Sequence, residues 1–428
     1  MEGLPPVLAG NSANSIQQAD GTQQPSMRPR ILSLSTVFPS PDDPRLGLFV
    51  RSRLLHLAEL CDIRVLSPIP AIDWAKLRGK SVPARGGISG WITDEGIQVA
   101  YPRWCYPPGG GAVNGFLMAA QLAGKVRRLR QRFPFDVIDA HFGHPDGVAA
   151  AALASRLGCP YLVTLRGNET AHARHGWRRR AMRWALRRAS RVITVSRRLA
   201  DFAADLGVER DRIRTIGNGV NSEVFRRLDR SACRRKHGIG EGIRVILSAG
   251  YLIERKGHHR IVRALRGLPA DVQLWIAGGP GREGIFESSL RALAAEPEVA
   301  GRVRFLGSVP PEELAELMNA ADVLCLASSR EGWPNVVHEA LSCGTPVVAA
   351  GIGAVPDMIP DSRYGIVVAP GDERALADAL GVAAGRSWDR EAIAAWGQSR
   401  GWRQVAEEVF EEVRAVIGGQ GNRAGIVK

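Results

Sequence analysis

Glu331 and Glu339 are the residues whose type and spacing first indicate chemistry. Seven residues separate them, and they follow an apolar run, Val323 to Leu326, that is typical of a buried strand. If a helix begins near Pro334, Glu339 lies in its second turn and Glu331 lies in the preceding loop. Backbone N–H groups at a helix start suit a diphosphate, and carboxylates accept hydrogen bonds from sugar or ribose hydroxyls. The spacing alone favours such a site no more than a capping loop with one solvated glutamate.

A glycine-rich segment, Gly279 to Gly284, follows the apolar run Val272 to Ala277 and matches the pattern G-x-G-x-x-G. That pattern is typical of dinucleotide-binding domains, in which an acidic residue after the next strand holds the ribose. Here the next apolar run ends in Gly307, and the motif lies in the middle of a domain instead of opening it. We therefore interpret Gly279 and Gly281 as residues that let backbone N–H groups approach a phosphate, and we expect no nicotinamide or flavin cofactor.

Short apolar runs alternate with helical patterns along the chain, which is typical of βαβ units and of parallel sheets covered on both faces. The candidate strands are 30–35, 63–66, 137–140, 161–165 and 192–195 in the first half and 245–249, 273–277, 303–306, 323–326 and 346–349 in the second. We predict an α/β fold with two Rossmann-like, doubly wound parallel-sheet domains. Ligands of such folds bind beyond the carboxyl ends of the strands, so we expect the site in the cleft between the domains.

The charge of the chain is uneven along its length. The 428 residues include 57 Lys and Arg against 43 Asp and Glu, a formal net charge of +14. Residues 1–220 hold 31 basic and 17 acidic side chains, whereas the remaining residues hold 26 of each. The whole excess therefore belongs to the first half, which predicts an anionic partner there: nucleic acid, a membrane surface or a phosphorylated substrate.

Several classes of protein are disfavoured by composition. The six cysteines show no C-x-x-C spacing, so we expect neither a zinc module nor a disulfide scaffold, and reduced thiols fit the cytoplasm. Residues 1–27 are rich in Gln, Ser, Asn, Gly and Pro and predict a disordered tail, not a signal peptide. Prolines and glycines interrupt the uncharged stretch 104–124, so we expect membrane contact to be peripheral at most.

Several further segments occur in a fixed order. In the second half they are 250–257, ending in Lys-Gly, 278–281, 303–307, 331–339 and 343–348; in the first half they are 137–147, 164–167, 195–196 and 216–221. Together they resemble the donor and acceptor domains of family 4 retaining glycosyltransferases, such as those that build bacterial exopolysaccharides and cell-surface glycans. The resemblance implies the GT-B fold, with an acceptor-binding domain over 28–222, a nucleotide-sugar-binding domain over 223–395 and a closing helix over 396–418.

The resemblance also implies roles on the donor side. Lys256 would neutralise the departing diphosphate, Glu339 would bind the nucleotide ribose and Glu331 would bind the hydroxyls of the transferred sugar. The family usually has an arginine where Tyr251 stands, so we expect Arg255 or backbone amides to supply the missing positive charge. The other donor-binding residues that it implies are Gly279, Gly281, Gly307, Gly332, Trp333, Pro334 and Asn335. The bulk of the Trp333 ring suits either a wall of the sugar pocket or packing between domains.

On the acceptor side, His141 aligns with the family histidine, and His144 lies three residues further along the same loop. The resemblance implies a neutral imidazole that orients a sugar hydroxyl or the acceptor, and not a simple general base. We therefore expect His141, Glu331 and Lys256 to form the catalytic set. The expected acceptor and cleft residues are Gly47, His144, Arg166 and Asn218.

Arginines and tryptophans alternate over 177–191 at helical spacing. An amphipathic helix packed on its domain explains this pattern, and so does a surface that binds anionic phospholipids through Arg179, Arg183, Arg187 and Trp184. A basic nucleic-acid-binding protein is the alternative from another class, but no recognised nucleic-acid module occurs in the sequence, so we expect no nucleic-acid partner.

The sequence therefore predicts a retaining glycosyltransferase that moves a sugar from a nucleotide sugar to a glycan or lipid-linked acceptor. We expect UDP- or GDP-sugar as co-substrate, no bound cofactor and no metal. The expected location is the cytoplasm, with contact to the inner face of the membrane. A nucleotide-sugar epimerase on the same fold is the enzymatic alternative.

Overall fold

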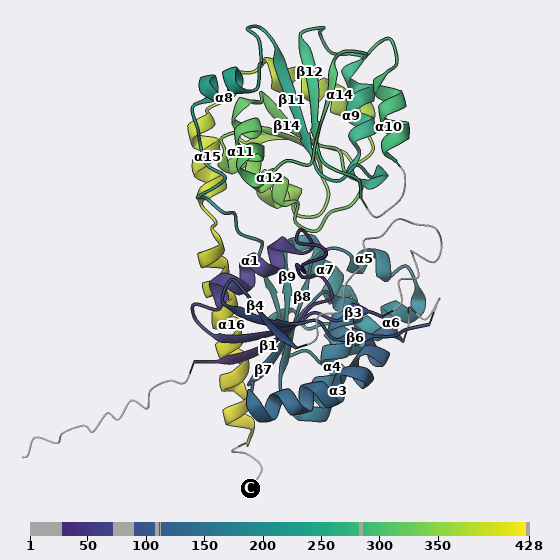
Figure 1. Cartoon of the computed structure of the whole chain (residues 1–428), viewed down its shortest axis with the longest axis vertical. Helices are drawn as coiled ribbons and strands as arrows, with labels where there is room; N and C mark the ends of the chain where they lie inside the picture. The colour runs from purple at the N-terminus through teal and green to yellow at the C-terminus, as the bar shows by residue number, and fades with distance from the viewer. Residues whose placement is uncertain (1–27, 72–89, 108–110, 112, 282–285, 425–428) are drawn as a thin grey trace, which may run out of the picture.

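The computed structural model describes residues 28–71, 90–107, 111, 113–281 and 286–424. Within these ranges the chain forms two α/β units that follow one another along the long axis of the molecule (Figure 1). Residues 1–27, for which the composition predicts a disordered tail, lie outside the described residues.

The first unit is built on an eight-stranded sheet with the order β10-β9-β8-β7-β1-β2-β5-β4. Its strands are β1 (Arg30–Leu34), β2 (Asp62–Leu66), β4 (Trp91–Asp94), β5 (Ile97–Ala100), β7 (Val137–His141), β8 (Tyr161–Leu165), β9 (Arg191–Thr194) and β10 (Ile213–Thr215). Every neighbouring pair is parallel except β4 and β5. The inner strands β7 and β8 are buried at every position, as parallel strands covered on both faces must be. A separate two-stranded sheet pairs β3 (Ile69–Pro70) with β6 (Arg103–Trp104).

Helices cover both faces of this sheet because side chains alternate along its strands. Ile31 of β1 packs in a core with α1 (Leu48–Leu57) and α16 (Trp402–Ala424), whereas Leu32 and Leu34 pack in the opposite core. The helices of that opposite face are α3 (Asn114–Arg132), α4 (Val148–Leu157), α6 (Gly176–Leu186) and α7 (Arg197–Asp205). The short helix α5 (Glu169–His172) follows β8.

The second unit has a six-stranded, wholly parallel sheet with the order β13-β12-β11-β14-β15-β16. Its strands are β11 (Arg244–Ala249), β12 (Val272–Ala277), β13 (Val303–Gly307), β14 (Val323–Leu326), β15 (Val347–Ala350) and β16 (Gly365–Val368). One face packs against α9 (His258–Leu265), α10 (Glu287–Ala294) and α14 (Glu373–Gly385), and the other against α11 (Pro311–Ala320), α12 (Asn335–Ser342) and α15 (Arg390–Gln398). The short helices α8 (Arg230–Lys236) and α13 (Val355–Met358) complete the unit.

The chain returns to the first unit through α16, which runs beside α1 (Figure 1). The Val220 N–H donates to the Arg400 carbonyl at 3.1 Å, so the outgoing and returning segments are joined side by side. The closing helix expected over 396–418 differs in its bounds. Residues 396–398 end α15, and α16 begins at Trp402 after a break and continues to Ala424.

The predicted fold class is confirmed, because both units contain parallel sheets with helices on both faces. Each of the ten candidate strands is present to within one residue at either end. The short edge strands β4, β10 and β16 have no counterpart among those candidates, because three or four residues carry little periodic signal.

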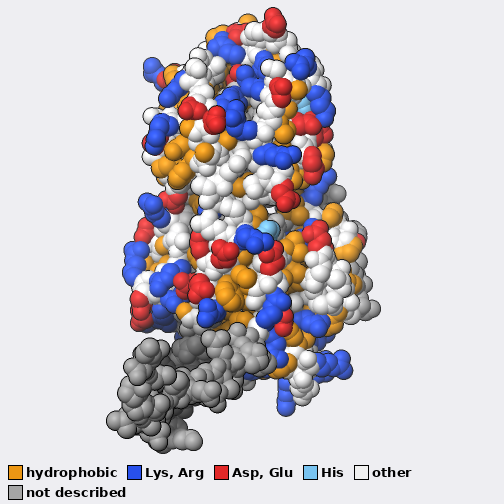
Figure 2. Space-filling view, turned by 90° about the vertical axis from the view of Figure 1, so that its left-hand side faces the viewer, with side chains coloured by type: hydrophobic (Ala, Val, Ile, Leu, Met, Phe, Trp, Pro, Cys, Tyr) orange, Lys and Arg blue, Asp and Glu red, His pale blue; other side chains and the backbone are white. Residues whose placement is uncertain are grey.

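Basic and acidic side chains are interspersed on the face shown in Figure 2, which is the side where α8 and α15 lie in Figure 1. Ion pairs of the described residues include Arg400 with Glu408 at 2.8 Å and Arg214 with Glu412 at 3.1 Å. The arginine-rich helix α6 lies on the opposite side of the molecule in Figure 1. In the described part of the chain, no helix combines the length and apolarity needed to cross a bilayer.

Candidate active site

A cavity of about 340 Å³ lies between the two units, at the carboxyl ends of β8, β11 and β14. Its lining includes four arginines and one glutamate, which makes it strongly cationic. The lining residues are Val37, Arg45, Leu46, Gly47, Phe49, Phe142, Arg166, Gly167, Asn168, Val195, Asn218, Tyr251, Arg255, Arg330, Glu331, Gly332 and Trp333. The cavity therefore occupies the position at which doubly wound sheets bind ligands.

Glu331 and Lys256 form the central ion pair of this region. Lys256 Nζ donates to Glu331 Oε1 at 2.7 Å, and the Ser328 hydroxyl donates to the same oxygen at 2.9 Å. Gly250, with φ of 145°, makes room for the lysine, because a Cβ there would lie 3.2 Å from Lys256 Cε. The loops after β11 and β14 thus bring together two residues that are 75 positions apart in the sequence.

Arg255 lies at the position expected for the second cation. Its Nη1 donates to the Arg330 carbonyl at 3.1 Å and lies 3.8 Å from Glu331 Oε2. Tyr251, which stands where the family usually has arginine, is 46% exposed and lines the same cavity. Arg255 and Tyr251 therefore line the same cavity, and the role of Arg255 as the second cation stays a prediction.

Glu339 lies in the second turn of α12, whose N-cap is Pro334, as the predicted helix start requires. Burial raises the pKa of the Glu339 carboxyl to about 7, and the Lys256 ammonium opposes this shift. Close to half of these carboxyls are therefore ionised at neutral pH in the protein without ligand.

Gly332 and Gly167 bring the backbones of the two units into contact. A Cβ at Gly332 would lie 1.8 Å from the Arg166 carbonyl oxygen, and a Cβ at Gly167 would lie 2.6 Å from Gly332 Cα. Trp333 fits both alternatives proposed from the sequence. It lines the cavity, and its ring also packs over Gly217 of the first unit, where a Cβ would lie 2.2 Å from the ring. Larger side chains at these glycines would force the units apart.

Gly279 and Gly281, in the turn after β12, lie close to neighbouring side chains. A Cβ at Gly279 would lie 2.4 Å from Ser308 Oγ, and one at Gly281 would lie 2.3 Å from a methyl group of Ile253. Gly307 adopts φ of 72° at the end of β13, a conformation that favours glycine. Residues 282–285 of the motif lie outside the described residues.

His141 lies behind the cavity wall, not in it. Its side chain is completely buried, Arg166 Nη2 donates to His141 Nδ1 at 3.0 Å, and His141 Nε2 lies 3.2 Å from Ser33 Oγ and 3.4 Å from Asp139 Oδ2. Because a guanidinium can only donate, Nδ1 accepts and the proton of the neutral ring is on Nε2. The structure therefore corrects the expectation that His141 touches the sugar or acceptor: the ring positions Arg166, which lines the cavity.

Burial and the neighbouring charged groups determine the protonation states of His141, Asp139 and Arg166. Burial lowers the pKa of His141 to about 4 despite the nearby Asp139 carboxylate, so the ring is neutral at pH 7. Burial would raise the pKa of Asp139, but Arg53, at 2.7 Å, together with His141 and Arg166, holds it well below its usual range. Burial also lowers the pKa of Arg166 to about 9, which leaves it cationic.

Arg166 connects this buried group to the second unit. Its Nη1 donates to Asn218 Oδ1 at 3.1 Å, and Asn218 Nδ2 donates to Asn335 Oδ1 at 2.9 Å. Asn335 is the first residue of α12, the helix that carries Glu339. A continuous chain of polar contacts therefore runs from the first sheet to the candidate donor site.

His144 does not share the interdomain cavity, contrary to expectation. It lines a separate cavity of about 250 Å³ with Trp104 and His172, because the turn that follows Phe142 directs it to the other side of the loop. Burial lowers the pKa of His144 to about 4. Gly47 does line the interdomain cavity; its φ of 72° and the close approach of the Val37 carbonyl, 2.4 Å from a Cβ placed there, account for glycine.

The predicted basic surface lies on α6. Arg179, Arg183 and Arg187 are exposed and form no ion pair with any described residue. Trp184 is partly buried against Phe116, with ring centroids 5.2 Å apart, and Trp177 is 70% exposed. The helix is therefore packed through its alanines while its arginines and one tryptophan face outwards.

Two cavity arginines, Arg45 and Arg330, are absent from the sequence predictions. Each directly precedes or lies close to a residue that was predicted, Arg330 before Glu331 and Arg45 before Gly47. Because they lie in the same loops as Glu331 and Gly47, the sequence could have indicated that they line the cavity. The buried partner of His141, Asp139, had a similar signal, because it lies two residues earlier on the same strand and faces the same way.

Two parallel-sheet units that face each other across a cleft, with a lysine–glutamate pair beside it, have the GT-B architecture. Residues 89–224 match the family model described as Glycosyltransferase Family 4, and residues 229–383 match the model described as Glycosyl transferases group 1. The chain belongs to glycosyltransferase family 4, and the resemblance drawn from its motifs is confirmed.

Curated relatives match to different extents. The putative teichuronic acid biosynthesis glycosyltransferase TuaC of Bacillus subtilis is 26% identical over 90% of this chain and 94% of its own length. The 2-deoxystreptamine glucosyltransferase of Streptomyces kanamyceticus is 31% identical over 62% of this chain and 72% of its own length. The chain spans about half the length of others, such as 47% of the D-inositol 3-phosphate glycosyltransferase of Mycobacteroides abscessus.

Among solved structures, Anabaena Alr3699/HepE in complex with UDP superposes with a TM-score of 0.71 at 21% identity. The match covers 90% of this chain and 100% of that one. This likeness shows the shared fold.

Proposed function

We propose that the protein transfers a sugar, with retention of anomeric configuration, from a nucleotide sugar to a glycan or lipid-linked acceptor of cell-surface polysaccharide or glycolipid synthesis. The observation that carries the proposal is the Lys256–Glu331 pair, 2.7 Å apart beside a cavity that also contains Arg255 and Arg330. Fixed cations of this kind stabilise the charge that develops on a departing diphosphate. Membership of family 4 supports the same reaction.

The residues supply each part of this chemistry. In the protein without ligand, Lys256 neutralises Glu331. When a diphosphate enters, the ammonium turns to the phosphate oxygens, and Glu331 accepts hydrogen bonds from the sugar hydroxyls. The bond from the anomeric carbon to the diphosphate oxygen breaks, the acceptor oxygen bonds to that carbon from the same face, and the acceptor proton passes to the departing phosphate. No metal and no bound cofactor take part in this proposal.

Product analysis tests the proposal. Purified protein is incubated with a nucleotide sugar, with and without acceptor glycans, and the products are followed by NMR. Transfer with the donor's anomeric configuration is expected, and net formation of an epimeric nucleotide sugar would contradict the proposal. Lys256→Ala and Glu339→Ala should each lose transfer while unfolding cooperatively, as the unaltered protein does.

We further propose that the donor nucleotide is UDP or GDP, with UDP favoured because the Anabaena protein of the same fold is described with bound UDP. A thermal-shift screen of UDP-, GDP- and ADP-sugars identifies the base directly. Stabilisation by an ADP-sugar alone would contradict this choice.

We also propose that α6 holds the protein at the inner face of the cytoplasmic membrane. Exposed Arg179, Arg183 and Arg187 suit anionic phospholipid head groups, and tryptophan suits the interface. Reversing these three charges to glutamate should release the protein from anionic liposomes. As a matched control, reversal of the exposed Arg226, Arg235 and Arg374 makes the same change of net charge in the second unit. Equal release by both sets of substitutions would contradict a specific surface.

A further inference from the structure

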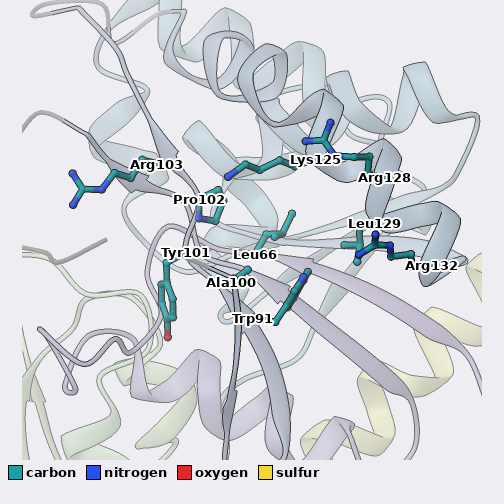
Figure 3. Close-up of a pocket in the computed structure, with 11 residues that line it drawn as sticks. Leu66, Trp91, Ala100, Tyr101, Pro102, Arg103, Lys125, Arg128, Leu129 and Arg132 are labelled. Atoms are coloured by element: carbon teal, nitrogen blue, oxygen red, sulfur yellow. The ribbon is translucent and has the colours of Figure 1, made fainter. Parts of the chain in front are cut away.

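A second cavity, of about 620 Å³, lies at the edge of the first sheet (Figure 3), and none of its lining residues lines the interdomain cavity. Strand register places Leu66, Ala100 and Trp91 in one row across β2, β5 and β4. The row continues with Leu34, which packs in the core beneath α3, so it faces the α3 side of the sheet. Trp91 is 37% exposed and Ala100 is partly exposed, whereas Leu66 is buried at the inner end of the row, so the floor is open at Ala100 and Trp91.

Three cations border this floor on one face of α3. Lys125, Arg128 and Arg132 follow the spacing i, i+3, i+7, so they lie above one another along the helix. All three are exposed, and none forms a hydrogen bond or ion pair with a described residue. Figure 3 shows Lys125 reaching from α3 towards Pro102, with Trp91 across the cavity. Like charges at this spacing repel one another, which an anion held between them would relieve.

We propose that this groove binds a phosphorylated amphiphile, with its phosphate between Lys125, Arg128 and Arg132 and its apolar chain along Leu66, Ala100 and Trp91. Phosphate accepts charge-assisted hydrogen bonds from all three side chains. A hydrocarbon chain would remove the exposed surface of Ala100 and Trp91 from water, which favours binding. Arg64 holds the Trp91 ring in place, with its guanidinium carbon 5.3 Å from the ring centroid.

Charge favours this occupant over a segment of the same chain. The sequence between β3 and β4, residues 72–89, contains four basic residues and one acidic residue, so its charge does not complement three cations. The groove is also separate from the α6 surface. Phe116, which contacts Trp184, precedes Lys125 by nine positions, or about 180° around the helix.

The test is isothermal titration of the full chain with dodecyl phosphate below its micelle concentration, with dodecyl maltoside and inorganic phosphate as comparison ligands. Dodecyl phosphate is expected to bind at least tenfold more tightly than either. The triple variant Lys125→Gln, Arg128→Gln, Arg132→Gln should weaken it at least tenfold, whereas a control with Arg127→Gln, Arg226→Gln and Arg235→Gln should not. Trp91→Ala should weaken dodecyl phosphate severalfold and leave inorganic phosphate unchanged.

Each other result overturns the proposal. Equal binding of the maltoside would show an apolar groove without anion recognition, and equal binding of inorganic phosphate would show an anion site without a chain. No binding by the unaltered protein would show that the groove does not bind a phosphorylated amphiphile. Because Lys125, Arg128 and Arg132 are exposed, their triple variant should unfold at the same temperature as the unaltered protein, which separates lost binding from lost fold. The titration contains neither donor nor acceptor, so its outcome is independent of the proposed transfer.

Discussion

Lowering the pH from 8 to 6 should weaken UDP binding about tenfold through Glu339 alone. A carboxylate accepts the hydrogen bonds of both ribose hydroxyls, whereas its protonated form gives up part of that capacity. Burial raises the pKa of Glu339 to about 7 in the protein without ligand. Ribose hydroxyls stabilise the ionised form, so binding lowers this pKa and releases a proton.

The magnitude follows from the ionised fraction. With a pKa of about 7, about nine tenths of the Glu339 carboxyls are ionised at pH 8 and about one tenth at pH 6. If only the ionised form binds the ribose well, the affinity changes by the ratio of these fractions, about tenfold or about 1.4 kcal/mol. Below pH 7 the logarithm of the affinity should rise with a slope near one, and above pH 8 it should level off.

Isothermal titration at pH 6, 7 and 8, in buffers of different ionisation enthalpy, measures both the affinity and the protons released. The phosphates of UDP also titrate in this range, so Glu339→Gln is the matched control that keeps the ligand's contribution and removes that of the protein. The difference between the two proteins should be tenfold between pH 6 and 8. An identical pH dependence in both would refute the assignment of Glu339 to the ribose.

Lys256→Met should lower kcat/KM by about 10²- to 10³-fold in a donor-turnover assay, because one preorganised cation is lost from the leaving group. The control Lys236→Met removes an exposed ammonium that pairs with Glu316, and it should leave kcat/KM unchanged. Gly332→Ala should lower both kcat/KM and the unfolding temperature, because its Cβ would lie 1.8 Å from the Arg166 carbonyl oxygen. The control Gly267→Ala, whose Cβ would have its nearest neighbour at 3.8 Å, should change neither quantity. Unchanged turnover in Gly332→Ala would contradict the close contact between the two units. Asn218→Ala should reduce kcat/KM about tenfold, since it removes the hydrogen bond to Asn335, and an unchanged kcat/KM would show that the link is dispensable. The free energy of unfolding of the unaltered protein in urea, taken relative to that of Glu339→Gln, should fall by about 3 kcal/mol as the pH rises from 4.5 to 8. The reason is that the folded chain holds the Glu339 proton more tightly than the unfolded chain. A rise in this relative free energy over the same pH range would contradict the raised pKa of Glu339.

The fold was predictable because each long strand has a local signal. A mostly apolar run such as Leu162 to Leu165 is typical of a strand that is buried on both faces. The helical patterns between such runs favour parallel pairing of the strands. The edge strands β4, β10 and β16 were not predicted, since segments of three or four residues carry little periodic signal. The partly exposed surface at Ala100 and Trp91 was not predictable either, because it depends on which strands end the sheet.

The candidate site was predictable where one loop carries it and not where distant loops meet. Glu331 lies in the loop before α12 and Glu339 lies in α12 itself, so the short spacing between them was enough to predict their relative positions. The hydrogen bonds from Arg166 to Asn218 and from Asn218 to Asn335 depend on how two domains face each other, which local periodicity does not encode. His141 and His144 are three residues apart, yet the turn between them sends one behind Arg166 and the other into a separate cavity.

The most direct test of the account is an NMR time course of sugar released from the nucleotide sugar that binds. The account predicts that the unaltered protein slowly releases nucleoside diphosphate and a sugar that first appears with the donor's anomeric configuration. It also predicts that Lys256→Met slows this release by about 10²- to 10³-fold. A first-formed sugar of the opposite configuration, or full release by Lys256→Met, would contradict the central claim that this cleft performs retaining transfer.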